Sequence, residues 1–186
     1  MRLVSVAAVA ENGVIGDDGS VPWPPLPADI EQYRARVADA PVILGRRTFE
    51  SMREDLPGTH QIVVSRRLET LVEPTAVVAA DVEEALALAS ERAADDAAYV
   101  LGGATIYDLF QPFVDEMALS HVDGRYDGDA RFPSWDRDEW TVVTETAYEG
   151  FTVREWRRTA RSDHPDTTRG ATRQDCTTRP GASGGR

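Results

Sequence analysis

The sequence contains no lysine, a single cysteine and no long apolar run. All 20 basic residues are arginine. One cysteine, Cys176, permits no intramolecular disulfide, so nothing points to an oxidising compartment. No run reaches the roughly eighteen apolar residues that cross a bilayer. The apolar start at 3–10 is short and alternates like a strand, and Glu11 follows it at once, which is unlike a signal peptide. We therefore predict a soluble cytoplasmic protein.

Positive charge is also scarce. The chain carries 32 acidic residues against 20 arginines, for a formal charge of −12. This balance disfavours general binding to nucleic acid or to an anionic membrane. Surface carboxylates hold hydrated cations, and concentrated salt screens their mutual repulsion. The composition is thus typical of a cytosolic protein from a halophile.

The order of apolar segments predicts an α/β fold. A chain of 186 residues suits one domain, which we place at 1–160. Strands and helices alternate, and this favours a mostly parallel twisted sheet with helices on both faces. The expected strands are 3–10, 41–45, 61–65, 75–80, 98–103, 116–123, 139–149 and 151–159, the last two forming an antiparallel hairpin that turns at Gly150. The expected helices are 28–39, 47–54, 81–93 with Asp81 as N-cap, and 104–113 up to the break at Pro112. The polar segment 161–186 is predicted to be a disordered tail.

Helix 28–39 has an apolar stripe, and its first turn carries an acid. Ile30, Tyr33 and Val37 share one side of this helix. Asp29 would ordinarily complement the helix dipole. It also follows Trp23 and three prolines, which favour a firm, water-poor wall. In such a pocket the carboxylate could grip a flat amidine-like heterocycle through two parallel hydrogen bonds and help to protonate it.

Two strand ends are basic. Gly45 ends one strand, and the next helix opens with Arg46, Arg47 and Thr48. Free N–H groups at a helix start, with guanidinium and hydroxyl donors, suit phosphates, including the 2′-phosphate of NADP. A solvated arginine pair is the alternative, but Ser65, Arg66 and Arg67 repeat the pattern at a second strand end, which favours a common anion site.

A third strand ends in a glycine pair. Gly102 and Gly103 allow the backbone to approach a ligand closely, and the helix that follows could receive a pyrophosphate. The pattern is not a GxGxxG fingerprint, and a simple turn is the alternative.

Taken in order, these motifs resemble the dihydrofolate reductase family, and a halophilic archaeal member in particular. The match runs from about residue 2 to 159 through VAAVAENGVIG, VPWPPLPADIEQYR, PVILGRRTFESM, LPGT, IVVSRR, YVLGGATIYDLF and MALSHVDGRYDGDARFP. The resemblance implies hydride transfer from NADPH to 7,8-dihydrofolate, giving tetrahydrofolate for one-carbon metabolism and thymidylate synthesis. It also implies a small-molecule substrate and, we expect, a monomer.

The resemblance assigns roles to residues. Asp29 matches the acid that binds the pterin and favours protonation of N5, Trp23 the tryptophan that orders a water there, and Ser120 a hydroxyl bonded to the acid. Other positions around the substrate are Val6, Ala7, Tyr33 and Phe49. Cofactor positions are Ala8, Ile15, Gly16, Gly45, Arg46, Arg47, Thr48, Ser65, Arg66, Gly102, Gly103, Ala104, Thr105, Ile106 and Tyr107, with a cis peptide joining the glycine pair. The loop 17–23 corresponds to a mobile lid.

The sequence departs from the family at two positions. Thr59, followed by His60, stands where an arginine normally binds the substrate's glutamate tail. Our hypothesis is that one of three arginines near the expected tail groove compensates, namely Arg34, Arg36 or Arg53. Thr105 stands where an arginine often reinforces the cofactor site. We still infer a preference for NADPH over NADH.

The remaining candidates are structural. His121 alternates with Ser120 along a strand and should point the other way, and the remaining histidines have no metal-ligand spacing with Cys176. No GxSxG motif supports a hydrolase, and three tryptophans are expected to be packing residues: Trp135, Trp140 and Trp156. Two rival functions stay open: a pyrimidine reductase of riboflavin synthesis on the same fold, and a binding module without turnover.

Overall fold

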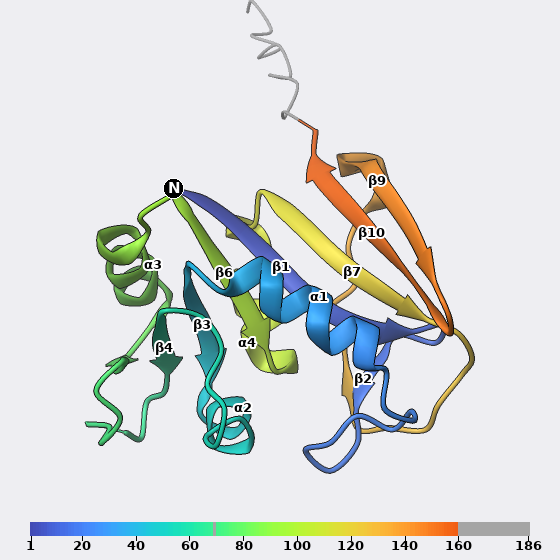
Figure 1. Ribbon diagram of the computed structural model, residues 1–186. Helices are drawn as coiled ribbons and strands as arrows, with labels where there is room; N and C mark the ends of the chain where they lie inside the picture. Colours follow the sequence, from blue (N-terminus) through green and yellow to red (C-terminus); the bar gives the residue numbers. More distant parts are fainter. Residues whose placement is uncertain (69, 160–186) are drawn as a thin grey trace, which may run out of the picture.

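The computed structural model describes residues 1–68 and 70–159, and an eight-stranded sheet runs through its centre (Figure 1). The segment 161–186, predicted to be a tail, lies outside the described residues. The strands are β1 (Arg2–Ala10), β3 (Pro41–Gly45), β4 (His60–Val64), β5 (Ala76–Ala79), β6 (Ala97–Gly102), β7 (Glu116–Val122), β9 (Trp140–Tyr148) and β10 (Phe151–Arg158). Their order in the sheet is β5-β4-β3-β6-β1-β7-β10-β9.

The sheet is parallel except at one edge. The pairs from β5 across to β7 are all parallel, whereas β10 is antiparallel to both β7 and β9. Gly150, at φ +82°, makes the turn between β9 and β10. The predicted sheet and hairpin are thus confirmed.

Helices cover both faces of the sheet. The helices are α1 (Pro27–Val37), α2 (Arg46–Ser51), α3 (Val82–Arg92) and α4 (Ala104–Phe110). Side chains of β1 alternate between two cores: Val4 and Val6 pack with residues of α1 and α2, and Leu3 and Ala7 with those of α3 and α4. Burial on both faces explains why the parallel strands read as continuous apolar runs.

The helix ends follow local sequence signals. Asp81 caps α3 by accepting a hydrogen bond from Glu84 N at 2.9 Å, as predicted. Pro112 lies in a 3-10 turn, η1 (Gln111–Phe113), that follows α4 at once. Among the described residues, none of the helices is long and apolar enough to span a bilayer.

Helix α1 is packed at only one end. Val37 is fully buried, whereas Ile30 is 47% exposed. The predicted apolar stripe therefore does not act as a continuous packing face. The reason is that the first turns of α1 overhang a cavity instead of the sheet, and Ile30 lines that cavity.

A small second sheet was not predicted. It pairs β2 (Val14–Gly16) with β8 (Ala130–Arg131) in antiparallel fashion. Trp23 packs nearby in a third core cluster, with Ala10 and Phe151 among its members. The expected lid loop, 17–23, thus follows β2 and ends at the buried Trp23.

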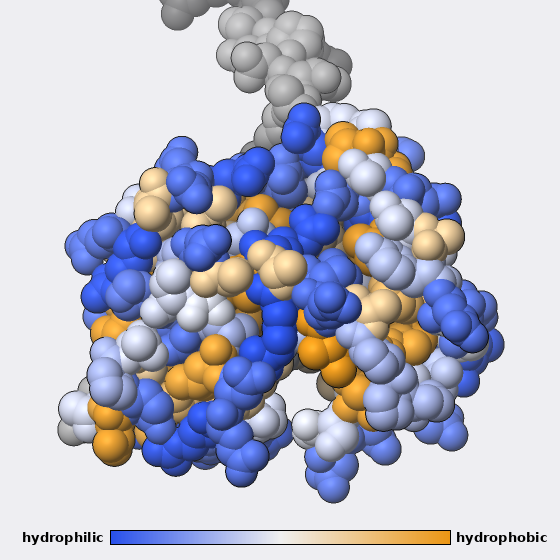
Figure 2. Space-filling model, in the orientation of Figure 1, coloured by the Kyte–Doolittle hydropathy of each residue, from blue (hydrophilic) through white to orange (hydrophobic). Residues whose placement is uncertain are grey.

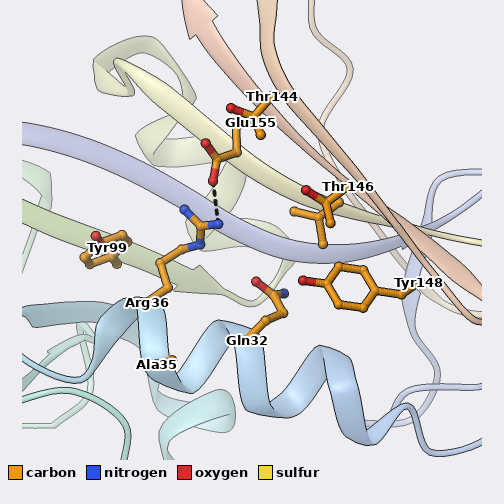
Figure 3. A pocket seen from close by; sticks show the side chains of 9 residues that line it. Gln32, Ala35, Arg36, Tyr99, Thr144, Thr146, Tyr148 and Glu155 are labelled. Carbon is orange, nitrogen blue, oxygen red and sulfur yellow. Dashed lines mark hydrogen bonds and ion pairs between the residues drawn. The ribbon is translucent and has the colours of Figure 1, made fainter.

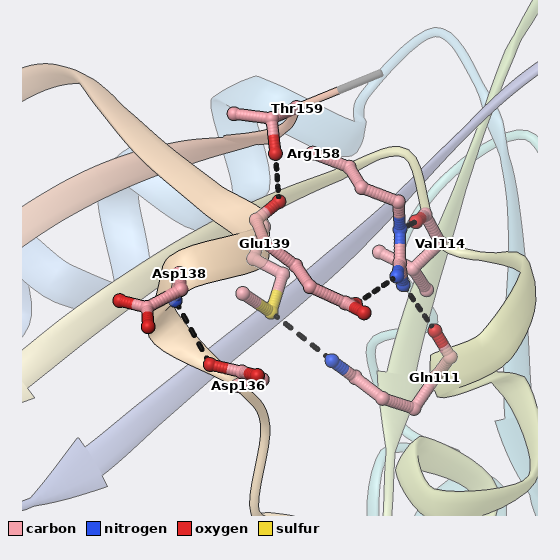
Figure 4. Close-up of polar contacts among 8 residues, drawn as sticks. Gln111, Val114, Asp136, Asp138, Glu139, Arg158 and Thr159 are labelled. Atoms are coloured by element: carbon pink, nitrogen blue, oxygen red, sulfur yellow. Dashed lines mark hydrogen bonds and ion pairs between the residues drawn. The ribbon is translucent and has the colours of Figure 1, made fainter. Parts of the chain in front are cut away.

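Arg158 fastens the end of β10 to the rest of the domain (Figure 4). Its guanidinium donates to the carbonyl oxygens of Val114 at 3.0 Å and Gln111 at 2.8 Å. It also pairs with Glu139, which closes the 3-10 turn η2 (Arg137–Glu139), at 3.0 Å. Two backbone carbonyls and one carboxylate thereby hold the last described strand against η1 and η2.

Candidate active site

A cavity of about 900 Å³ opens at the carboxyl ends of β1, β3 and β6. Parallel strands end at the same edge, where ligands bind in open α/β sheets. Residues Val6, Ala7 and Ala8 of β1 form its floor, and α1 and the loop before it form one wall. In Figure 2 the surface is hollowed between the α2 region and that loop, within a mostly hydrophilic face.

Asp29 faces this cavity with its carboxylate fixed by side chains. Leu26 is the N-cap of α1 and provides no side-chain cap bond, and Asp29 does not bond to the free N–H groups of its own helix. Its Oδ1 instead accepts from the Ser120 hydroxyl at 2.5 Å and from Gln32 Nε2 at 3.0 Å. The contact to Ser120 joins residues 91 positions apart, so the fold places this acid in the cavity wall.

Two aromatic side chains flank Asp29. Trp23 is only 6% exposed, lines the cavity and meets Tyr126 edge-to-face with ring centroids 5.7 Å apart. Tyr33 lies one turn further along α1, and burial raises the pKa of its phenol above the usual 10.0. The Tyr33 hydroxyl is therefore a neutral hydrogen-bonding group at physiological pH.

Glycines let the strand ends of the opposite wall contact α4 directly. At Gly45 a methyl group would lie 3.0 Å from Ile106 Cγ1, so the end of β3 touches α4 directly. At Gly102, where φ is +91°, a methyl group would lie 2.5 Å from the ring of Tyr107. The peptide bond between Gly102 and Gly103 is cis, as the resemblance implies.

Tyr107 secures this wall to the floor. Its ring is 5% exposed, and its hydroxyl donates to the carbonyl oxygen of Val6 in β1 at 2.6 Å. Burial raises the pKa of Tyr107 far above its ordinary value, so the phenol stays neutral and keeps this bond. The strand β1 and the turn after β6 are thereby joined at the cavity.

The basic residues after β3 differ in their freedom. Arg46 is held by Glu50 one turn along α2, with both carboxylate oxygens within 2.8 Å of its Nη1. Arg47 is exposed and forms no ion pair among the described residues. Thr48 lies beside the glycine turn, because a methyl group at Gly103 would be 3.5 Å from its Oγ1. Neither α2 nor α4 has a side-chain N-cap, which leaves their first N–H groups to other partners.

Most residues predicted for the site line this one cavity. They are Val6, Ala7, Ala8, Ile15, Gly16, Trp23, Asp29, Tyr33, Gly45, Arg46, Arg47, Thr48, Gly103, Ala104, Thr105, Ile106, Tyr107 and Ser120. Segments from residue 6 to residue 120 thus meet at a single place.

Four predicted residues do not line the cavity. Phe49 points into the core with 1% of its surface exposed, on the inner side of α2. Gly102 lies behind the Tyr107 ring. Ser65 follows β4 in a turn, where its hydroxyl accepts from the backbone N–H groups of Arg67 and Leu68. Arg66 is exposed in the same turn.

Several lining residues were missed by sequence reasoning. Gln32 is the most important, since it contacts both Asp29 and Ser120. Its position three residues after Asp29, on the same side of a helix, was an available signal. Leu26, Ile30 and Met52 add apolar surface, and nothing in their local pattern separates them from ordinary core positions.

The three arginines expected near the substrate tail all have carboxylate partners. Arg34 bonds to Asp55 at 2.8 Å and lies over the Tyr33 ring, 5.6 Å from its centre. Arg36 pairs with Glu155 at 2.6 Å, away from the main cavity. Arg53 pairs with Glu73. Of the three, Arg34 contacts a residue of the cavity wall, Tyr33. Thr59 is exposed just before β4.

His121 lies on the other face of β7 from Ser120. Its ring meets Trp156 edge-to-face at 6.5 Å, and Trp156 belongs to the core shared with α3 and α4. Burial, with Arg154 and Arg137 nearby, lowers its pKa below 6.5. Trp135 and Trp140 pack in the same region, with ring centroids 6.0 Å apart. These side chains serve packing, as predicted.

The sheet topology places this chain among the α/β proteins that bind ligands at the carboxyl ends of parallel strands. Its cavity has an acid on one wall and glycine-lined strand ends on the other. Comparison with known proteins then shows which family the chain belongs to. The family model described as Dihydrofolate reductase matches residues 2–164. The chain therefore belongs to the dihydrofolate reductase family.

Individual relatives agree with this assignment. The dihydrofolate reductase HdrB of Haloferax volcanii is 40% identical over 159 residues, covering 81% of this chain and 80% of that protein. Dihydrofolate reductase 1 of Haloarcula marismortui is 39% identical over 170 residues, covering 83% and 90%. Both organisms are halophilic archaea, as the acidic composition indicated. The dihydrofolate reductase of Enterococcus faecalis, solved with NADP(H) and RAB-propyl, superposes with a TM-score of 0.75 at 27% identity, covering 85% of this chain and 96% of that one.

Proposed function

We propose that this protein is an NADPH-dependent dihydrofolate reductase, which reduces 7,8-dihydrofolate to 5,6,7,8-tetrahydrofolate by hydride transfer. The observation that carries the proposal is Asp29, a carboxylate held in the wall of a large cavity by Ser120 and Gln32. Family membership and the halophilic reductases similar to this chain support it further. We expect a cytoplasmic monomer that works at high salt.

In this proposal Asp29 anchors and polarises the substrate. A pterin presents two parallel N–H donors along one edge, and a carboxylate accepts such a pair well. Negative charge at this edge favours protonation of the ring nitrogen N5, directly or through a water that Trp23 helps to order. The neighbouring carbon then becomes a better hydride acceptor. Val6, Ala7 and Tyr33 would pack around the ring and its tail.

The glycine-lined wall fits a dinucleotide. The donors there are Arg46, Arg47 and Thr48, and Gly45 and Gly103, which have no side chains, present backbone to the cavity. When bound, NADPH supplies the hydride. Arg46 and Arg47 would hold its phosphates, while Ala7, Ile15 and Gly16 would enclose the nicotinamide against the substrate. For the glutamate tail, Arg34 is the arginine we favour, because it lies on the cavity-lining Tyr33.

The test follows NADPH oxidation with dihydrofolate, at low and at multimolar salt, for the wild type and for Asp29→Asn. We expect an active wild type and a variant impaired by about a hundredfold or more at neutral pH. Acid should partly rescue the variant, because the substrate then arrives already protonated. Equal activity of the two proteins at pH 7 would show that Asp29 takes no part in the mechanism. Binding of NADPH and dihydrofolate without turnover would show that the protein is not a reductase.

The arginine assignment has its own test. Arg34→Ala, Arg36→Ala and Arg53→Ala are compared by their KM for dihydrofolate. We expect the largest increase for Arg34→Ala and little change for Arg36→Ala, whose partner Glu155 lies away from the main cavity. Three unchanged values would reject the idea that any of them replaces the missing arginine at Thr59.

A further inference from the structure

Gln32 lies between two cavities. It lines the main cavity, and it also lines a second pocket of about 470 Å³ on the far side of α1, which we call the rear pocket. The rear pocket lies between α1 and the hairpin β9–β10, and its lining includes Arg36, Thr146, Tyr148 and Glu155. Figure 3 shows Gln32 projecting from α1 toward β9. Its side chain therefore separates the acid from the rear pocket.

The hydrogen bonds around Asp29 leave its two oxygens unequal. The Ser120 hydroxyl donates its single proton to Oδ1, and Gln32 Nε2 shares its two protons between Oδ1 and Ser120 Oγ, at 3.0 and 3.2 Å. A carboxylate oxygen has two lone pairs, so both acceptor positions of Oδ1 are filled. Among the described residues, no hydrogen bond reaches Oδ2.

A bound amidine edge needs one position on each oxygen. Oδ2 is open, but Oδ1 must release a donor before the second parallel bond can form. Ser120 is 2% exposed and makes the shorter bond, at 2.5 Å. Gln32 is only partly buried and its bond is longer, at 3.0 Å. Gln32 is therefore the donor that a bound amidine edge displaces from Oδ1.

The rear pocket offers the displaced amide a place to go. In Figure 3 the Gln32 amide and the Tyr148 hydroxyl point toward one another, and Thr146 lies beside them. These hydroxyls can satisfy an amide that has left Asp29, so the displacement need not leave a polar group without partners.

We propose that Gln32 is a removable cap on Asp29, which bonds to Oδ1 and turns into the rear pocket when an amidine-edged ligand binds. The inference rests on the proposed function, since it concerns the same acid. Gln32 is in this view a positioning residue, and it sets part of the cost of ligand binding.

The experiment measures the affinity of a 5-aryl-2,4-diaminopyrimidine, whose protonated ring carries the same pair of parallel donors. Gln32→Met keeps the length of the side chain and removes the competing N–H groups, so we expect binding about fivefold tighter. Thr146→Phe narrows the rear pocket from an exposed strand position, and we expect binding about fivefold weaker. In the double variant the Thr146→Phe effect should vanish, because no amide remains to be displaced.

Several outcomes decide the matter. Glu31→Met, on the exposed side of α1, is the control for a changed helix residue and should bind as the wild type does. Weaker or unchanged binding by Gln32→Met, additive effects in the double variant, or a crystal structure of the complex with Gln32 Nε2 still bonded to Oδ1 would each overturn the cap. If the wild type oxidises NADPH with dihydrofolate and Asp29→Asn does not, the proposed function stands whatever Gln32 does. If the wild type shows no such turnover, the proposed function itself is in error.

Discussion

The two walls of the main cavity are built by different means. On the wall formed by α1 and the loop before it, which we call the acid wall, Asp29 is held by two side chains, those of Ser120 and Gln32. On the opposite, glycine-lined wall, which we call the nucleotide wall, the shape depends on glycines that bring main chain against the side chains of Ile106 and Tyr107. One wall is tuned by hydrogen bonding and charge, and the other by volume.

This contrast teaches where the domain can tolerate change. Substitutions on the acid wall should alter ligand binding and the pH dependence of activity while the fold survives. Those in the glycine turns should damage the fold and the cofactor site together, because packed interiors resist added atoms.

The largest effect is expected for Gly102→Ala. Its φ of +91° strains any side chain, and the added methyl group would meet the Tyr107 ring at 2.5 Å. We expect a loss of about 3 kcal/mol in the free energy of unfolding, measured by denaturant at constant salt. The Michaelis constant for NADPH should rise in the same variant.

Gly13→Ala is the matched control for that variant. Gly13 has a similar φ of +81°, but a methyl group there meets nothing within 4 Å. It should lose about 1 kcal/mol through backbone strain alone. An equal loss in the two variants would mean that the Tyr107 ring is not what makes Gly102 indispensable.

A smaller effect is expected for substitutions that change charge on the nucleotide wall but not its packing. Arg46→Gln should raise the KM for NADPH by about tenfold and leave that for NADH nearly unchanged, if Arg46 meets the 2′-phosphate. Glu50→Gln should lower the KM for NADPH, because it frees the Arg46 guanidinium from the ion pair along α2. Steady-state kinetics with both cofactors measures this, and a rise in KM for Glu50→Gln would show that the pair orients Arg46 instead of competing for it.

The smallest effect is expected for His121→Gln, which should change the pH dependence of stability but not that of activity. The folded-state pKa of His121 is lowered by burial and by Arg154 and Arg137, against the pull of Glu145. Below pH 6.5 the unfolded chain therefore binds more protons than the folded one, and stability falls as the pH drops toward the folded pKa. His121→Gln should flatten this fall and change Tm by less than about 3 °C, with the activity profile unaltered. A shifted activity profile would link His121 to Asp29 through the neighbouring Ser120.

The sequence predicted the sheet well because its strands are buried on both faces. Their short apolar runs, the N-cap at Asp81 and the turn at Gly150 are local signals, and the structure follows them. The family resemblance supplied the contact between Ser120 and Asp29, which no local pattern could reveal.

Features that depend on distant partners were missed or misplaced. The small sheet of β2 and β8 has strands of three and two residues, too short for any periodic pattern. Ile30 is apolar and correctly spaced for a core position, yet it overhangs a cavity and stays 47% exposed. Gln32 carries no motif at all, since its importance comes from the strand and the pocket on either side of it.

The contact between Gly102 and Tyr107 has a consequence for how the family can diverge. Any larger residue at 102 requires a smaller one at 107, yet shrinking Tyr107 also removes the hydroxyl that binds Val6. Gly102 and Tyr107 can then be exchanged only together, and either single step passes through a less stable intermediate, whereas Val6 contributes only its backbone carbonyl. Lineages should therefore keep this pair frozen while the residues around Asp29 drift one at a time.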